Sequence, residues 1–583
     1  MAETRIRLLG PPRIESPGTT PAQPKGRKAW AVLAYLALQP DGISRSRTAT
    51  LLFPDAADPL GALRWNLSEL RRTLVGVSIT GDPLRLTLLQ HWRCDALELV
   101  GPANGHGLDP RRFDGQLLEG LSFADNPVFD SWLAEQRYRL ENCIQSALYE
   151  ASLAALASGN PAGAVELATL ALRRDPFHAD CTAALVKALV ALGEHRRARE
   201  EVTKCAELYH RELGLPLPAE VRRALSDAAP AADPGITATA STVRSYLDAG
   251  SASLSAGAVD RGLDQLRLAV VLAQRTADRH LVAESLVTLA GALIHQAGGR
   301  GAEVADFLHR ALSAEAPDGV SRTAAAAFRE LGYLSVQRGV PDRAAGWLDR
   351  AMQAARGIPA EQARILAIQG MLASDTAHYG DAVAAFAESR RLARAVRNRR
   401  QQAFSEALLG RVHLLRGDLE LAAAALDRAL DGIAEEHWTA FEPFAAGVRG
   451  ETYLAAGRLD AAADLIDRSW VMAELAGDHC YLALAAGAEA RLFLAHGDLA
   501  AAEQWIERGL EPKPWYLWYT ARLLDVAAEV TIATGSPRAS QFVDRLAALA
   551  SRSGMREFVV RAQSHRAALG DEAAAQSVPW LAK

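Results

Sequence analysis

The sequence predicts a mainly α-helical protein that begins with a small α+β domain and continues as an α-solenoid. Two observations carry this prediction. In residues 1–100, short strand-like segments flank three helix-like segments, and from residue 242 onward turn glycines recur every 37 to 41 residues. With 583 residues, 49% of them hydrophobic, the chain is long enough for three or four domains.

The N-terminal segments follow one another in an order that specifies a fold. Ser44 is a natural N-cap, and Gly81-Asp82-Pro83 is a turn between two short strands. The elements that we predict are strands at 4–9, 13–15, 77–80 and 84–89 and helices at 25–38, 44–52 and 58–74. Three helices followed by a hairpin make a winged helix-turn-helix.

The third predicted helix, Asp58–Leu74, has two different faces. At 3.6 residues per turn, one stripe holds only leucine and must be buried, and it consists of Leu63, Leu67, Leu70 and Leu74. The opposite side carries Arg64, Trp65, Ser68, Arg71 and Arg72. Guanidinium groups and a hydroxyl suit a groove of phosphates and base edges, so we expect this face to contact DNA. Further phosphate contacts are expected from Lys25, Arg45, Arg47 and Arg85.

Charge is unevenly distributed along the chain. The net charge is −5, yet residues 1–100 hold 13 basic and 9 acidic residues, and residues 25–75 hold 8 basic and 4 acidic ones. A basic head on an acidic body favours a local contact with nucleic acid.

Several segments together resemble a known family. The N-terminal ones are Arg7–Pro11, Gly26–Leu38, Ile43–Asp55 and Ala62–Leu74, followed by Phe113–Leu121, Trp132–Leu140, Arg173–Asp180, Ala188–Ala198 and Glu212–Leu225. In this order they resemble the OmpR-type winged helix and the bacterial transcriptional activator domain of the antibiotic-regulatory activators. The resemblance implies a DNA-binding activator that binds direct-repeat operators, with a second domain that dimerises or contacts RNA polymerase.

Repeats account for the remainder of the chain. Gly159 and Gly193 are 34 residues apart, which is tetratricopeptide spacing. The later turn glycines are Gly257, Gly298, Gly339, Gly380, Gly417, Gly457, Gly497 and Gly535. A motif of Leu or Ile, an acid and Arg recurs at one phase in 346–352, 424–430, 464–470 and 504–510. We therefore predict a winged helix at 1–100, an activator domain at 101–226, a linker at 227–242, a solenoid at 243–566 and a tail at 567–583.

Aromatic residues mark one edge of the C-terminal repeats. They stand at the start of successive repeats and comprise Trp438, Phe441, Phe444, Tyr481, Trp515, Tyr516, Trp518 and Tyr519. The simpler interpretation is packing between repeats. The alternative is a site for a peptide, a partner protein or a small-molecule effector. Because four aromatics within five residues cannot share one helix face, we expect one of the pairs 515/518 and 516/519 to be inside and the other nearer the groove.

No motif for catalysis or for a cofactor occurs in the sequence. It contains no G-x-x-x-x-G-K-[ST], H-E-x-x-H or G-x-S-x-G, and its five cysteines are scattered, so we expect no enzyme, metal or cofactor. Without a signal peptide or an 18-residue apolar run, we expect a cytoplasmic protein, associated with the nucleoid when bound to DNA.

The function predicted from the sequence is a sequence-specific DNA-binding regulator, an activator, whose repeats sense an effector or recruit a partner. The alternative is an interaction scaffold whose winged helix no longer binds DNA. The hairpin sequence GDPLRL, where the family has Gly-Tyr-x-Leu, and an acidic residue, Glu69, that we place in the basic face both favour the alternative.

Overall fold

A computed structural model describes residues 3–18, 20–39, 42–89, 91–100, 109–226, 238–255, 258–296, 298, 301–315, 319–511, 513–571 and 574. Gly257 and most of the predicted linker and tail, 227–242 and 567–583, lie outside these residues. Within them the chain is mainly α-helical, as predicted, and it divides into two compact units, Met1–Ser146 and Ala147–Lys583. We describe each unit by itself.

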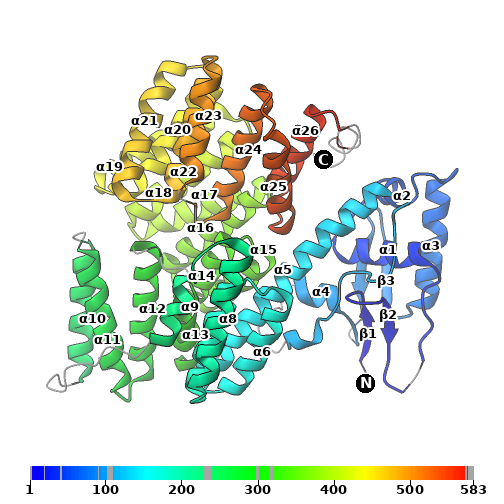
Figure 1. The fold of residues 1–583 in the computed structure, drawn as a ribbon, viewed down its shortest axis with the longest axis horizontal. Helices are drawn as coiled ribbons and strands as arrows, with labels where there is room; N and C mark the ends of the chain where they lie inside the picture. Colours follow the sequence, from blue (N-terminus) through cyan, green and yellow to red (C-terminus); the bar gives the residue numbers. More distant parts are fainter. Residues whose placement is uncertain are drawn as a thin grey trace. The chain divides into compact units, whose positions relative to one another are not determined.

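Unit 1 has the predicted order of strands and helices (Figure 1). Its elements are β1 (Thr4–Arg7), β2 (Arg13–Glu15), α1 (Arg27–Ala37), α2 (Arg45–Leu52), α3 (Pro59–Thr73), β3 (Val77–Thr80), β4 (Arg85–Leu88), β5 (Trp92–Cys94), α4 (Asp95–Val100), η1 (Pro110–Arg112) and the first part of α5 (Pro127–Ala157). Strands β1 and β2 are antiparallel, while β3 and β4 form the predicted hairpin. Strand β5, which we did not predict, pairs parallel with β1.

The compact unit extends beyond the predicted boundary at residue 100. Phe123 and Phe129 are fully buried, and the ring of Trp132 contacts that of Tyr35 in α1 at 4.9 Å. The side-chain amide of Asn126 donates to the carbonyl of Leu51 at 2.7 Å. Residues 109–146 therefore complete the core that the first hundred residues begin.

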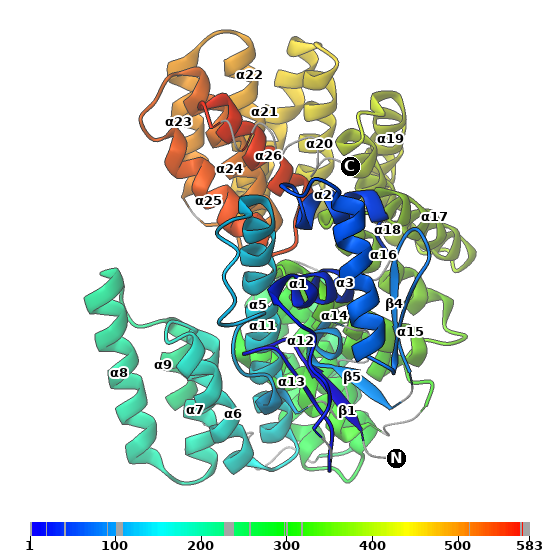
Figure 2. The ribbon, with the colours of Figure 1, turned by 90° about the vertical axis from the view of Figure 1, so that its right-hand side faces the viewer.

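Unit 2 is a succession of packed helices, which Figures 1 and 2 show from cyan to red. They are α6 (Pro161–Arg174), α7 (Ala179–Ala191), α8 (His195–Leu213), α9 (Ala219–Ser226), α10 (Ala240–Ser255), α11 (Val259–Gln274), α12 (Arg279–Gln296), α13 (Ala302–Ala314), α14 (Arg322–Gln337), α15 (Pro341–Ala354), α16 (Pro359–Asp375), α17 (Tyr379–Ala395), α18 (Arg399–Leu415), α19 (Leu419–Glu435), η2 (Thr439–Phe441), α20 (Glu442–Ala455), α21 (Leu459–Ala476), α22 (His479–Ala495), α23 (Leu499–Leu510), α24 (Leu517–Ala533), α25 (Ala539–Arg552) and α26 (Arg556–Ala568). Consecutive helices pack on one another from α6 to α9 and again from α10 to α26, so the predicted helical repeats are confirmed.

A close helix crossing explains the recurring motif. In three of the four motif copies the Leu or Ile faces a glycine 16 positions earlier in the partner helix, and Phe386 makes the same contact in a helix without the motif. The pairs are Gly332 with Leu348, Gly370 with Phe386, Gly410 with Leu426 and Gly450 with Ile466. A Cβ atom on these glycines would lie 2.8, 2.7, 2.5 and 2.6 Å from the facing side chain, so glycine allows a close approach at these four crossings. In the fourth copy the residue 16 positions before Ile506 is Ala490.

One predicted turn glycine is in the wrong place. Gly380 lies inside α17, and the turn before that helix is made by Ala377, whose φ is 64°. A second series of left-handed residues, which the glycine pattern did not reveal, ends the other helix of each pair at Gly357, Arg397, His437 and Gly477, 40 residues apart. Because Ala, Arg and His also adopt this conformation here, the count of glycines alone could not locate every turn.

Helices of the predicted activator domain pack within the same unit as the solenoid. The carboxylate of Glu150 accepts hydrogen bonds from Arg343 and, at 3.1 Å, from the indole of Trp347. Asp180 pairs with Arg338 at 3.0 Å. Residues 147–226 are thus bonded to α14 and α15. The predicted boundaries at 226 and 242 stay predictions.

All five cysteines are buried and unpaired with one another. Among the helices that the structure describes, none combines the length and the hydropathy needed to cross a bilayer.

Candidate functional site

The leucine stripe of α3 is buried, as predicted. The exposed fractions of Leu63, Leu67, Leu70 and Leu74 are 1%, 1%, 0% and 1%. The Asp58 carboxylate caps the helix by accepting from the backbone N–H of Gly61 at 2.8 Å, and Pro59 occupies its first turn. This core orients the opposite side of α3 toward solvent.

The solvent-facing side of α3 holds all five residues predicted there. Arg64, Trp65, Ser68, Arg71 and Arg72 are exposed, and 62% of Trp65 is accessible. Arg64 pairs with Asp58 at 3.2 Å, and Arg72 pairs with Glu69 at 2.5 Å, each with a side chain that is 68% exposed. The pair with Asp58 is exposed on both sides and is therefore weak, whereas the carboxylate of Glu69 is only 7% exposed.

Two of the predicted DNA-contacting arginines hold the hairpin instead of projecting freely. The guanidinium of Arg71 donates to the carbonyl of Ile79 in β3 at 2.6 and 3.0 Å. Arg45 donates through Nε to the carbonyl of Gly81 at 3.1 Å. The hairpin is also bonded through Ile43, whose backbone pairs with that of Leu84 at 3.1 and 2.7 Å. These bonds fix the position of the hairpin beside α2 and α3.

The remaining predicted contacts differ in exposure. Lys25 and Arg85 are exposed, and Arg47 is half-buried. Glu69, which we placed in the basic face, is only 7% exposed. Its carboxylate accepts from Arg72 and from the backbone N–H of Lys25 at 3.4 Å. The negative charge of Glu69, which favoured the alternative without DNA binding, is therefore buried and paired with Arg72.

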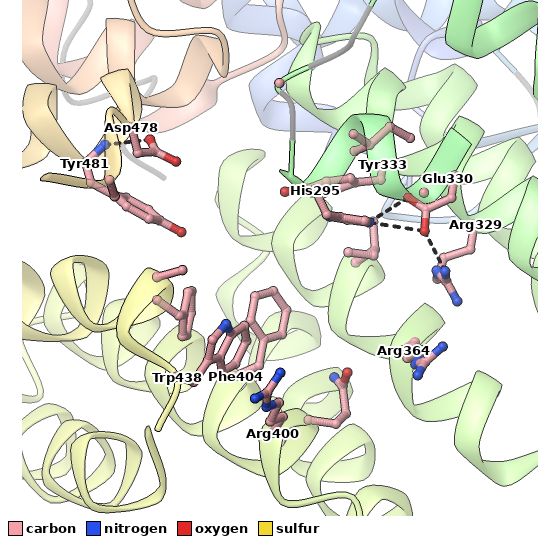
Figure 3. A pocket seen from close by; sticks show the side chains of 18 of the residues that line it. His295, Arg329, Glu330, Tyr333, Arg364, Arg400, Phe404, Trp438, Asp478 and Tyr481 are labelled. Atoms are coloured by element: carbon pink, nitrogen blue, oxygen red, sulfur yellow. Dashed lines mark hydrogen bonds and ion pairs between the residues drawn. The ribbon is translucent and has the colours of Figure 1, made fainter. Parts of the chain in front are cut away.

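A second candidate site is a long groove in unit 2, with a volume of about 1640 Å³. Its lining comes from alternate helices α12, α14, α16 and α18, from η2 and α22, and from Trp515 before α24. Figure 3 shows its labelled side chains around an open space: His295 and Glu330 on one side, Trp438 and Phe404 on another, and Tyr481 facing them.

The aromatic edge predicted from the sequence forms a continuous series of ring contacts. Phe404, Trp438 and Phe441 pack at centroid distances of 4.7 to 6.4 Å. The series continues through Phe444 to Tyr481 at 6.0 Å and from there to Tyr519 at 6.1 Å. Of the predicted edge, Trp438, Phe441, Tyr481 and Trp515 line the groove.

The other four predicted edge residues are buried, and Phe444 is 1% exposed. Tyr516, Trp518 and Tyr519 are 2%, 3% and 6% exposed. From helical spacing we expected one of the pairs 515/518 and 516/519 to be inside and the other nearer the groove. The structure differs because α24 begins only at Leu517, so Trp515 and Tyr516 precede the helix. The four aromatics do not follow one helical period, and only Trp515 reaches the groove.

Tyr516 and Trp518 surround an ion pair that has no access to solvent. Arg411, 2% exposed, donates to Asp375 at 2.7 Å and to the hydroxyl of Ser374 at 2.8 Å. The hydroxyl of Tyr516 donates to the same carboxylate, and the guanidinium lies 4.3 Å from the ring of Trp518. These two aromatics pack and bond within the core.

A charged cluster forms the opposite part of the groove. Glu330, 2% exposed, accepts from His295 at 3.1 Å and from Arg329 at 2.5 Å. Burial alone would raise the pKa of Glu330, but the charges of His295 and Arg329 outweigh it and hold the pKa below its usual range. Arg329 also donates to Glu361, which is 1% exposed. Both carboxylates are thus neutralised from within.

The groove contains residues that our sequence analysis did not select, although a signal for them exists. Counting in steps of 40 from Trp438 gives Asn398 and Asp478, and all three line the groove. The same step from Tyr481 gives Phe441, Gln401 and Glu361, which also line it. A repeat keeps one helix face toward the groove, so the phase of a single lining residue locates its equivalents.

Comparisons with known proteins identify no family for this chain. No family model and no curated protein match it. Among solved structures, a Mycobacterium tuberculosis EmbR complex with a low-affinity phosphopeptide has a TM-score of 0.32 at 17% identity, over 39% of this chain and 65% of that one. Yeast Tom70 has a TM-score of 0.34 at 12% identity, over 78% and 95% of the two chains. Aspartyl phosphate phosphatase F from Bacillus subtilis has a TM-score of 0.37 at 14% identity, over 70% and 93%. The chain thus spans less than two thirds of the EmbR structure, and likenesses this low carry no argument about function.

Proposed function

We propose that this chain is a sequence-specific DNA-binding transcriptional regulator, an activator, and that its N-terminal unit is a winged helix of the OmpR type. The observation that carries the proposal is the division of α3 into a buried leucine stripe and an exposed face with Arg64, Trp65, Ser68 and Arg72. A helix whose apolar face is buried in the core and whose exposed face is basic fits the major groove of DNA. No catalytic step is part of this proposal.

The hairpin beside α3 supports the same role. Arg85 in β4 is exposed, and Arg45 and Arg71 hold the hairpin against the helices. Phosphate contacts from a hairpin place a recognition helix in register on the duplex. In this proposal Lys25, Arg47 and Arg85 contact phosphates. Arg64 exchanges its exposed partner Asp58 for a base edge or a phosphate, and Arg72 reaches one with the donors that Glu69 does not use.

The test begins with selection of bound sequences from a random duplex library, using the full chain. Arg64→Ala should then weaken binding to the selected duplex by about 1–3 kcal/mol if the guanidinium contacts a base. Arg71→Ala should also change the hairpin, because it removes the bonds to Ile79. Arg211→Ala is the matched control, since this arginine is 71% exposed on α8, outside unit 1.

The affinity of the full chain for the selected duplex should fall linearly with salt on a log–log scale. If no duplex is enriched, or if Arg64→Ala and Arg72→Ala both bind like the parent, the proposal fails.

The groove in unit 2 favours the second candidate, an interaction scaffold that binds a partner and no DNA. If that candidate is right, no duplex is enriched, and the groove still binds its partner.

By its resemblance the chain would act on direct-repeat operators, as a homodimer or in contact with RNA polymerase, and its repeats would sense an effector. These finer parts of the proposal depend on the same experiment. The arrangement of the selected sites, single or repeated, would test the first of them directly.

A further inference from the structure

The groove in unit 2 carries a surplus of positive charge toward solvent. Four arginines line it, Arg322, Arg329, Arg364 and Arg400, against three acidic residues. Two of these acids, Glu330 and Glu361, are 2% and 1% exposed and are bonded to Arg329 from within. The side chains of Arg364 and Arg400 are 42% and 57% exposed. The buried carboxylates therefore offer little compensation at the surface of the groove.

Arg364 is held in an unfavourable electrostatic position. Burial lowers the pKa of its guanidinium, and the neighbouring charges of Arg329 and Arg322 lower it further. The carboxylate of Glu361 lies 3.6 Å away, beyond a good hydrogen bond. An anion placed in the groove beside Arg364 would relieve this repulsion and gain charge-assisted hydrogen bonds.

The other half of the groove is aromatic. Trp438 and Phe441 stack at 4.7 Å, Phe404 lies against both, and Tyr481 faces them (Figure 3). Arg400 belongs to both halves, since its guanidinium lies 5.9 Å from the ring of Trp438. An apolar or aromatic group bound here would be flanked by rings on more than one side.

The size of the groove separates a peptide from a small molecule. Small-molecule sites are clefts of about 300–1,000 Å³ that enclose most of their ligand. The volume here is about 1640 Å³ and extends over helices α12 to α22. Asn398 and Gln401 also line the groove. Asn398 Oδ1 accepts from the backbone N–H of Gln401 at 3.0 Å and Gln401 Nε2 donates to Ser389 at 3.3 Å, so Asn398 Nδ2 and Gln401 Oε1 are the atoms that can bond an extended backbone.

We propose that this groove binds an extended peptide segment with acidic residues at the α14–α16 end and an aromatic residue at the end formed by Phe404, Trp438 and Tyr481. Charge complementarity identifies the acidic part, and the ring contacts identify the aromatic part. The inference rests on one part of the proposed function, the sensing of an effector by the repeats. It does not depend on DNA binding, because peptide binding is measured without DNA.

The test selects peptides from a displayed library of random dodecapeptides on the immobilised full chain. We expect enrichment of sequences that combine Asp or Glu with Trp, Tyr or Phe. Binding of the best synthetic peptide should weaken about tenfold or more in Arg364→Ala and in Trp438→Ala. It should also weaken with rising salt, because the acidic half of the contact is partly exposed.

Matched variants separate the groove from the general surface. Arg391→Ala removes an exposed arginine on α17 that pairs with Glu388, and Trp505→Ala removes a half-buried ring that contacts Trp470. Neither side chain lines the groove. Both variants should bind the peptide like the parent, and thermal melts should show that Arg364→Ala and Trp438→Ala remain folded.

A charge reversal makes the sharpest prediction. The double variant Arg364→Glu with Arg400→Glu should shift the enriched peptides from acidic to basic. The inference is overturned if the parent enriches no peptide, or only basic ones, or if groove variants bind as tightly as the two controls. Competition by duplex DNA at the groove would overturn it as well. Duplex selection by unit 1 is scored separately, so either proposal can fail alone.

Discussion

Arginines are used in opposite ways in α3 and in the repeats. Arg64 and Arg72 are each 68% exposed, and the partner of Arg64, Asp58, is itself 65% exposed. Arg411 is 2% exposed and is bonded to Asp375 and Ser374 inside the repeats. The difference shows that residue type alone does not identify a binding surface. An arginine opposite a leucine stripe is available to a ligand, whereas one between two repeats belongs to the core.

The groove lies between these two extremes. Arg329 neutralises two buried carboxylates and is 13% exposed, whereas Arg364 beside it is 42% exposed. One arginine of the cluster therefore stabilises the repeat, and its neighbour, 3.6 Å from the carboxylate of Glu361, is the one that we propose contacts the peptide.

Arg411→Ala should be the most damaging change. It leaves the carboxylate of Asp375 buried without its cationic partner, which costs about 3–5 kcal/mol. Hydrogen exchange of amides in α24 of the full chain measures this locally. Arg391→Ala, on the exposed side of α17, should leave the exchange unchanged. Equal exchange in the two variants would mean that the buried pair contributes nothing.

Leu67→Ala should destabilise α3 by about 2–5 kcal/mol, because it opens a cavity in the buried stripe. The side chain is 1% exposed, and hydrogen exchange in α3 reports the loss. Leu67→Met keeps most of the volume and should cost less than about 1.5 kcal/mol. If both variants exchange like the parent, the stripe is not the core of this unit.

The stability of unit 1 should decrease as pH rises from about 4 to 6. Burial raises the pKa of Asp95 to about 6, although its carboxylate accepts from the backbone N–H groups of Leu8 and Leu9 at 2.8 and 3.1 Å. In the unfolded chain the carboxyl group releases its proton near pH 3.9. Between pH 3.9 and pH 6 the folded state therefore binds this proton more tightly than the unfolded state does, and the free energy of unfolding falls by at most about 3 kcal/mol over this range.

Hydrogen exchange of the amides in β1 and β5, corrected for its intrinsic pH dependence, measures how the free energy of unfolding of this region changes with pH. Asp95→Asn cannot titrate and should flatten this change. A parent whose stability increases over the same range would contradict the assigned direction.

Trp65→Ala should have the smallest effect on stability, within about 0.5 kcal/mol, because 62% of the side chain is exposed. Trp518→Ala is its natural comparison: that ring is 3% exposed, and its loss should cost about 3–5 kcal/mol. Thermal melting of both variants decides whether exposure separates them. Trp65→Ala should instead weaken binding to the selected duplex.

Local sequence patterns were enough to predict the three helices and the hairpin of unit 1 and the repeated helix pairs of unit 2. Hydrophobic period and capping residues sufficed because the leucines of α3 and the carboxylate of Asp58 act within one helix. The sequence also placed Trp438 and Tyr481 on one edge, since repeats preserve phase.

Only the tertiary structure decided which side chains are available. Glu69 and Arg72 are three residues apart, yet one is buried and the other exposed, because α1 and its preceding segment cover one side of α3. Tyr516 and Trp515 are adjacent, yet the first bonds Asp375, which is 141 residues away, and the second lines the groove. Periodicity gives the face of a helix, but burial of a polar or aromatic group depends on partners distant in sequence, and no local pattern records them.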